Sequence, residues 1–129
     1  MKEPKWLKHN VVSHLHNLLL AEHGGPAGTR GDSLLRSALD SPRNKFSYKP
    51  DCTLHDLAAA YTFGIARNPP FVDGNKRTAF VCGALFLELN GLVVTASETD
   101  AVIAMESVAA GSMDELKLVE WFRLNSVDS

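Results

Sequence analysis

The chain has 129 residues, 45% of them hydrophobic and 22% charged, with a formal net charge of −2. This length suits a single domain over residues 1–129, and the charge argues against a nucleic-acid partner because few phosphates could be neutralised. No apolar run is long enough to span a membrane and no signal peptide is visible, so we expect a cytoplasmic protein without a membrane partner.

The first part of the chain predicts two helices followed by a polar flap. The apolar residues of the first helix recur at helical spacing up to the terminator Gly24-Gly25-Pro26: Val11, Val12, Leu15, Leu18 and Leu19. Asp32 can cap a short second helix that ends before Pro42. The next segment, "SPRNKFSYKPDC" at 41–52, is polar and rich in turn residues, which predicts an exposed flap.

The rest of the chain predicts four more helices. "TLHD" at 53–56 is a capping-box-like start, and "TAFVCGALFLELNG" at 78–91 is apolar almost all round, as expected of a buried central helix. "LVVT" after Gly91 predicts a short extended piece, while Ser97 and Ser112 each begin a capped helix. About six helices without βαβ alternation predict a compact all-α bundle.

The loop "RNPPFVDGNKRTAF" at 67–80 enters the predicted central helix. The first N–H groups of a helix lack internal partners and carry the positive end of the dipole, and Gly74 lets the backbone approach a ligand. Three side chains strengthen the prediction of an electropositive phosphate-binding nest: the amide of Asn75 and the cations Lys76 and Arg77. Asp73 could hold a Mg²⁺ that bridges phosphate oxygens.

Plainer interpretations of the same residues exist. Asp73 could be an ordinary N-cap, and Asp-Gly-Asn is also common in turns. Lys76 and Arg77 are harder to explain as a solvated first turn, because cations there oppose the helix dipole. Two such cations therefore indicate an anion opposite them.

The stretch "PPFVDGNKR" resembles the signature of the Fic/Doc superfamily, His-x-Phe-x-(Asp/Glu/Asn)-(Gly/Ala)-Asn-x-Arg. The surrounding "LAAAYTFGIARNPPFVDGNKRTAFVCGALFLELNG" is similar to the death-on-curing (Doc) branch, and the similarity runs from about residue 18 through the last helix. The resemblance implies a Fic/Doc-like helical fold. It also implies that Phe71 points into the core, that Asp73 is the residue associated with Mg²⁺, and that the ATP phosphates bind at four positions: Gly74, Asn75, Lys76 and Arg77.

Two positions bear on the reaction that the resemblance implies. Members that transfer AMP typically have a second glycine at the position of Lys76 and an arginine at that of Phe80. These departures favour the Doc branch, which transfers the γ-phosphate of ATP. Such members phosphorylate elongation factor Tu, stop translation and are neutralised by an antitoxin, so both proteins are expected partners.

Pro69 occupies the position of the family's catalytic histidine. Proline has no titratable group and cannot take a proton from a target hydroxyl. None of the histidines is near the motif in sequence, and each is expected at the surface or as a cap: His9, His14, His16, His23 and His55. We therefore expect an impaired phosphotransferase. The alternatives are an AMP transferase of the Fic type and a non-catalytic module that binds nucleotide or antitoxin.

Overall fold

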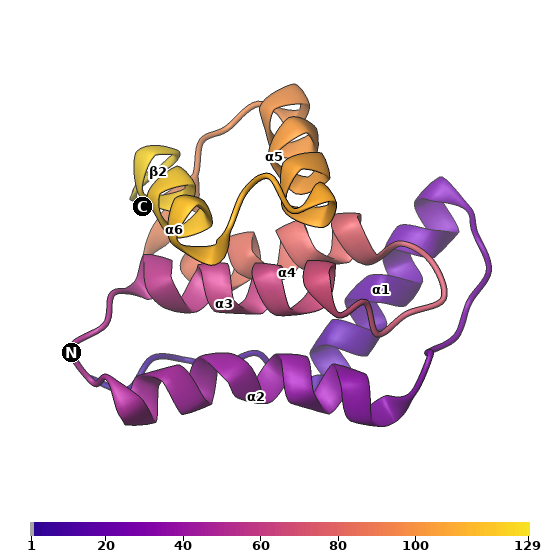
Figure 1. The fold of residues 1–129 in the computed structure, drawn as a ribbon, viewed down its shortest axis with the longest axis horizontal. Helices are drawn as coiled ribbons and strands as arrows, with labels where there is room; N and C mark the ends of the chain where they lie inside the picture. The colour runs from indigo at the N-terminus through magenta and orange to yellow at the C-terminus, as the bar shows by residue number, and fades with distance from the viewer. Residues whose placement is uncertain (1) are drawn as a thin grey trace.

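The computed structural model describes residues 2–129, and helices dominate it (Figure 1). Within this range the elements follow in the order α1 (His9–His23), α2 (Asp32–Tyr48), α3 (Leu54–Arg67), α4 (Asn75–Leu89), β1 (Leu92–Val94), α5 (Glu98–Ala110), α6 (Glu115–Leu124) and β2 (Ser126–Asp128). The prediction of an all-α protein of about six helices is confirmed. Over the same residues, no helix has both the length and the apolar character needed to cross a bilayer.

Helix α3 lies at the centre of the fold. It contacts α2 on one side and α5 and α6 on the other, and it packs along α4 (Figure 1). Its N-terminus is fixed by the predicted capping box, in which Thr53 Oγ1 accepts from the Asp56 N–H and the Asp56 carboxylate accepts from the Thr53 N–H. Eight of its 14 residues are buried, so the core of the protein forms around this helix.

Helix α2 continues through Pro42 to Tyr48, so the prediction of a flap over 41–52 is wrong for most of that segment. Pro42 removes one backbone hydrogen bond, but its ring is buried against the core. One turn later, Phe46 packs edge-on against Trp6, with 5.8 Å between ring centroids, and the Arg43 guanidinium lies 5.5 Å from the Trp6 ring. This packing outweighs the local preference of a polar, proline-containing sequence for a turn or loop.

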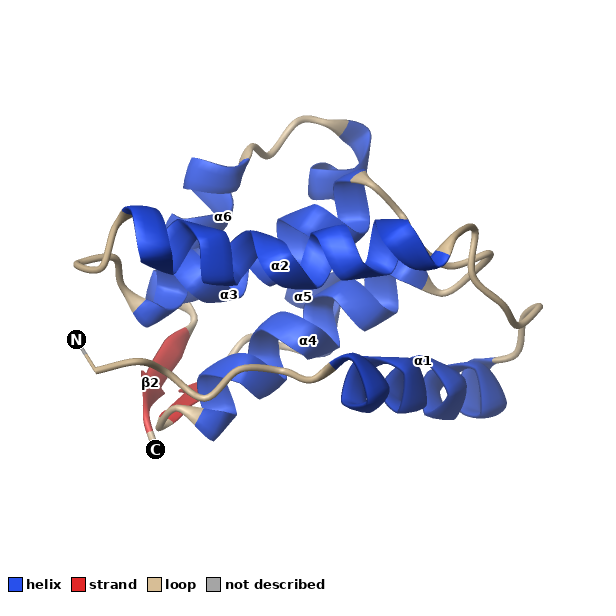
Figure 2. Ribbon diagram, turned by 90° about the horizontal axis from the view of Figure 1, so that it is seen from below, coloured by secondary structure: helices blue, strands red, loops and turns tan. Residues whose placement is uncertain are grey.

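The C-terminal third corrects one smaller prediction and confirms another. The N-cap of α6 is Asp114 and not Ser112, because the Ser112 hydroxyl donates to the Ser107 carbonyl at the end of α5. The predicted extended piece after Gly91 is β1, and it pairs antiparallel with β2, which the sequence pattern did not reveal. Figure 2 shows this small sheet at one end of the helical body and α1 at the other.

The segment that covers the motif loop is the connection between α1 and α2. The Arg30 N–H donates to the Pro70 carbonyl at 2.7 Å, and the Val72 N–H donates to the Gly28 carbonyl at 3.0 Å. An antiparallel bridge between Thr29 and Phe71 joins the same two segments. The loop 68–74 is therefore fixed from α1 and α2 as well as from its own flanking helices.

Candidate functional site

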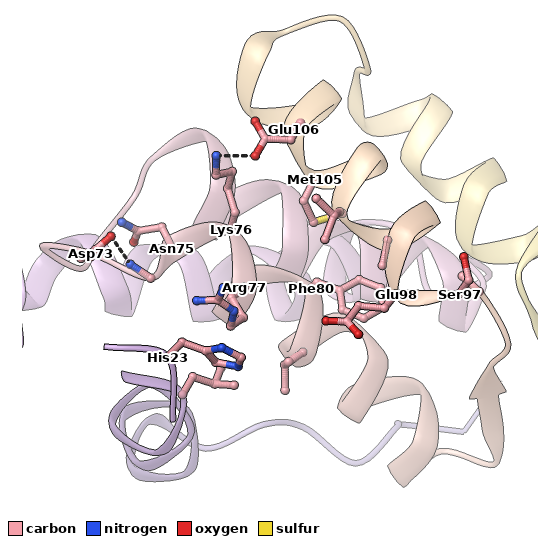
Figure 3. Close-up of a pocket in the computed structure, with 16 residues that line it drawn as sticks. His23, Asp73, Asn75, Lys76, Arg77, Phe80, Ser97, Glu98, Met105 and Glu106 are labelled. Carbon is pink, nitrogen blue, oxygen red and sulfur yellow. Dashed lines mark hydrogen bonds and ion pairs between the residues drawn. The ribbon is translucent and has the colours of Figure 1, made fainter. Parts of the chain in front are cut away.

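A cavity of about 660 Å³ lies between α1, α4 and α5, at the point where α4 begins (Figure 3). The motif residues Asp73 to Arg77 line one wall, the last turns of α1 another, and α5 a third. The fold thus brings together five predicted site residues: Asp73, Gly74, Asn75, Lys76 and Arg77. Pro69, at the start of the loop, is not among the lining residues.

The turn into α4 leaves its first N–H groups without a side-chain cap. Gly74 is the N-cap residue in the left-handed conformation, with φ 80° and ψ 17°, which a residue with a Cβ rarely adopts. The Asp73 carboxylate does not cap the helix further along, because its Oδ1 accepts from the adjacent Gly74 N–H at 2.8 Å. The first turn contains no acidic residue either, so the helix end remains open to an anion.

Asn75 holds the loop together with its side chain. Its Oδ1 accepts from the Phe71 N–H and its Nδ2 donates to the Phe71 carbonyl, both at 3.0 Å. The amide that we expected to orient an anion is therefore engaged with the backbone. What remains for an anion at this position is the helix end itself.

Phe71 is the core anchor that the resemblance implied, with 1% of its surface exposed. His16 from α1 stacks on it, with 3.7 Å between ring centroids and 8° between the planes, and His16 Nε2 donates to the Asp73 carbonyl at 2.7 Å. The expectation of a surface position is wrong for His16, which is 2% exposed. Its spacing of four residues from both Val12 and Leu20, the other buried residues of α1, could have revealed this.

The cavity is not the electropositive nest that the loop sequence predicted. Lys76 Nζ forms an ion pair with Glu106 Oε1 of α5 at 2.7 Å (Figure 3). An anion was expected opposite the two cations, and for Lys76 this anion is a carboxylate of the protein itself. Three carboxylates line the cavity, those of Asp73, Glu98 and Glu106, against the two cations. Positive character is confined to the end of α4 and to Arg77, which forms no ion pair within residues 2–129.

His23, in the last turn of α1, lines the cavity together with Arg77 (Figure 3). It was not predicted as a site residue because it is distant from the motif in sequence. It is partly exposed, and its ring lies 3.8 Å from the neighbouring Glu22 carboxylate. This imidazole reaches the site only because α1 packs against α4.

Asp73 can serve a metal only together with other ligands. No group of three or more His, Cys, Asp or Glu side chains suited to a metal occurs within residues 2–129. Mg²⁺, however, commonly binds through one or two carboxylates and completes its octahedron with phosphate oxygens and water. Asp73 therefore fits a Mg²⁺ that arrives with a nucleotide, and not a metal held by protein side chains alone.

Comparison with known proteins assigns the chain to a family. The Fic/DOC family matches residues 6–87, so the chain belongs to that family. It is 30% identical over 80 residues to the "Protein kinase doc" of Escherichia phage P1, covering 62% of this chain and 64% of that protein. It is 40% identical over 75 residues to the "Toxin Doc" of Mycolicibacterium smegmatis, covering 57% of each.

The family match does not cover the whole site. The chain spans less than two thirds of the length of either of these relatives. The family match ends at residue 87, so it contains the motif loop, α1 and most of α4, whereas α5 lies beyond it. The wall that carries Glu98 and Glu106 therefore lies outside the part of the chain that matches the family.

Proposed function

We propose that the cavity binds ATP with Mg²⁺ and that the protein is a Doc-type toxin, a phosphotransferase weakened by the loss of its general base. The observation that carries this proposal is the N-terminus of α4, which has no side-chain cap, follows a left-handed Gly74 and opens into a cavity of about 660 Å³. Beside it lies Arg77, which forms no ion pair with any residue from 2 to 129. A helix end of this kind attracts phosphate oxygens through its N–H groups and its dipole.

In this arrangement each motif residue has a defined task. Arg77 neutralises charge on the phosphates, Asp73 is a ligand for the Mg²⁺ that accompanies them, and Lys76 is available to a phosphate oxygen once it leaves Glu106. Bound Mg²⁺ supplies charge neutralisation and orientation of the phosphates. Phosphoryl transfer depends mainly on such positioning and electrostatic stabilisation, so most of the required apparatus is retained.

The group transferred is proposed to be the γ-phosphate. Lys76 and Phe80 replace residues that mark AMP-transferring members, and the phage P1 relative is named as a protein kinase. The acceptor is proposed to be a hydroxyl of a translation elongation factor, and an antitoxin is the proposed regulatory partner. A toxin with such a target would act in the cytoplasm. AMP transfer is the alternative, and the mass added to the acceptor distinguishes the two.

Pro69 limits the rate in this proposal. A general base typically accelerates proton transfer by roughly 10²–10⁴-fold, and a proline ring cannot accept a proton. Nucleotide binding does not require that base, so affinity for ATP can persist without turnover. This favours a second candidate function, a binding module that holds nucleotide or antitoxin and catalyses nothing.

The Pro69→His variant tests the proposal. We expect this variant to transfer labelled phosphate from ATP to purified elongation factor Tu at least about 10²-fold faster than the unaltered chain does. Pro69→Gln is the control, because it also removes the proline ring but supplies no base at neutral pH. A Pro69→His variant as inert as Pro69→Gln would contradict the disabled-base account and favour the binding module.

A further inference from the structure

Gly25 lies against the side chain of Asp73. A Cβ built on Gly25 would overlap the Asp73 Oδ2 atom, and it would lie 3.3 Å from Asp73 Cγ and 3.4 Å from Leu20 Cδ2. Gly25 also has φ +120°, a conformation that side chains rarely adopt. The connection after α1 therefore forms the support against which the Asp73 carboxylate rests.

His16 holds the backbone of the same residue from the other side. Its Nε2 donates to the Asp73 carbonyl, and its ring is clamped flat against Phe71. The ring also borders the next residue, since a Cβ on Gly74 would lie 3.5 Å from His16 Nε2. Because His16 is almost completely buried, its ring is held in place by packing, and this partly buried hydrogen bond constrains the loop.

From these contacts we infer that His16 and Gly25 are positioning residues for Asp73. His16 fixes the Asp73 carbonyl, and Gly25 leaves room for the Asp73 carboxylate, whose Oδ1 is bound by the Gly74 N–H. Neither residue belongs to the motif. The inference rests on the proposed function, since it assigns these residues to the Mg²⁺-dependent part of nucleotide binding.

Gly24 provides a matched control for Gly25. Both glycines belong to the turn that ends α1, and both have positive φ, +81° at Gly24 and +120° at Gly25. A Cβ on Gly24, however, would have no atom within 4 Å. Substituting either glycine by alanine strains the backbone, but only Gly25→Ala displaces the Asp73 carboxylate.

Calorimetric titration of the full chain with ATP tests the inference, with Mg²⁺ and again with EDTA. In Mg²⁺ we expect Gly25→Ala to bind ATP about 10-fold more weakly than Gly24→Ala, and in EDTA we expect the two variants to bind alike. A general loss of structure would weaken both titrations, so dependence on Mg²⁺ distinguishes positioning from folding. Equal affinities of the two variants in Mg²⁺ would overturn the role of Gly25.

A second pair of variants separates the two contacts of His16 and serves if Gly25→Ala does not fold. His16→Gln keeps an N–H donor at the position of Nε2 but loses the ring, whereas His16→Phe keeps the stacked ring but loses the donor. We expect His16→Gln to retain Mg²⁺-dependent ATP binding within about 3-fold and His16→Phe to lose about 10-fold. Equal binding by these two variants would overturn the role of the hydrogen bond.

The titrations distinguish a failure of the proposed function from a failure of the inference about Gly25. If the unaltered chain binds no ATP in Mg²⁺, the proposed function fails and the inference fails with it. If the unaltered chain binds and Gly25→Ala matches Gly24→Ala, the proposed function stands and the assignment of Gly25 alone is wrong.

Discussion

Lys76 lies in the first turn of α4, where its charge opposes the helix dipole, and Glu106 neutralises it from α5. Both side chains are about half exposed, so the pair contributes little to folding. Its effect is on the cavity, because Glu106 engages one of the two cations of the lining and adds a carboxylate beside it. In the proposed function, a nucleotide competes with Glu106 for Lys76.

Replacing Glu106 with glutamine should therefore strengthen ATP binding. The change removes one negative charge from the cavity lining and frees Lys76, and for an exposed pair we expect a gain of roughly 3- to 5-fold in affinity. The gain should shrink at high salt, because exposed charges are screened. Calorimetry at low and high ionic strength measures both effects.

Glu120→Gln is the control for this prediction, since Glu120 pairs with Arg123 on α6 and does not line the cavity. If Glu106→Gln and Glu120→Gln change the affinity equally, the Lys76–Glu106 pair does not compete with the nucleotide.

Sequence alone identified the motif residues because they are consecutive and their types are specific. It could not identify Glu106 or His23, which reach the cavity only through the packing of α5 and α1 on α4. Glu106, together with Glu98, turns a predicted cationic nest into a cavity lined by more carboxylates than lysine and arginine side chains. The loop sequence shows only the charges of one wall, whereas the carboxylates of Glu98 and Glu106 on α5 also line the cavity.

At the scale of elements, α3 and α4 approach each other at Gly83. A Cβ on Gly83 would overlap Thr62 Oγ1 and lie 2.7 Å from Phe122 Cζ and 3.2 Å from the Ala58 carbonyl oxygen. The Thr62 hydroxyl is buried and donates to the Ala79 carbonyl of α4 at 2.7 Å. The absence of a side chain at Gly83 thus permits both the close approach and the hydrogen bond.

Gly83→Ala should lower the free energy of unfolding by about 1–3 kcal/mol, because the added methyl group overpacks the contact between the helices. Urea denaturation followed by circular dichroism measures this. Gly64→Ala is the matched control, since Gly64 lies inside α3 and the nearest atoms to its Cβ would be those of Ala38, at an ordinary 3.7 Å. We expect Gly64→Ala to be neutral or stabilising, as alanine is the better helix former. Gly83→Ala as stable as Gly64→Ala would contradict the packing described here.

The sequence predicts the elements that depend on local signals better than those that depend on distant contacts. The caps at Thr53 and Ser97 and the apolar run of α4 were sufficient signals, because local sequence decides those features. Helix α2 was underestimated because its last two turns depend on burial of Pro42 and on Trp6, which lies about 40 residues away in the chain. Strand β2 was missed because its partner β1 is a distant three-residue segment.

For the molecule as a whole, His55 links the start of α3 to the C-terminal strand. Its Nε2 lies 3.0 Å from the Ser126 hydroxyl, and burial lowers the pKa of His55 below its ordinary value, although the Asp56 carboxylate acts in the opposite direction. The folded protein therefore favours the neutral imidazole, whereas the unfolded chain takes up a proton near pH 6.5.

It follows that His55 makes stability depend on pH. Its contribution is fully present above about pH 6.5 and falls as the pH is lowered towards the folded pKa, because the unfolded state binds more protons there. His55→Gln should therefore show a smaller loss of unfolding free energy between pH 7.5 and pH 5 than the unaltered chain. Identical pH profiles for His55→Gln and the unaltered chain would refute the assignment.

The central claim is that the open end of α4 and Arg77 bind the phosphates of a nucleotide, and the Arg77→Ala variant tests it most directly. A charge-assisted hydrogen bond contributes about 1.5–3 kcal/mol, which corresponds to roughly 10- to 100-fold in affinity. In calorimetric titration with ATP and Mg²⁺, we expect the unaltered chain to bind and Arg77→Ala to bind at least about 10-fold more weakly, with Arg123→Ala unchanged. Equal affinity of the unaltered chain and Arg77→Ala, or no binding by the unaltered chain, would contradict the account.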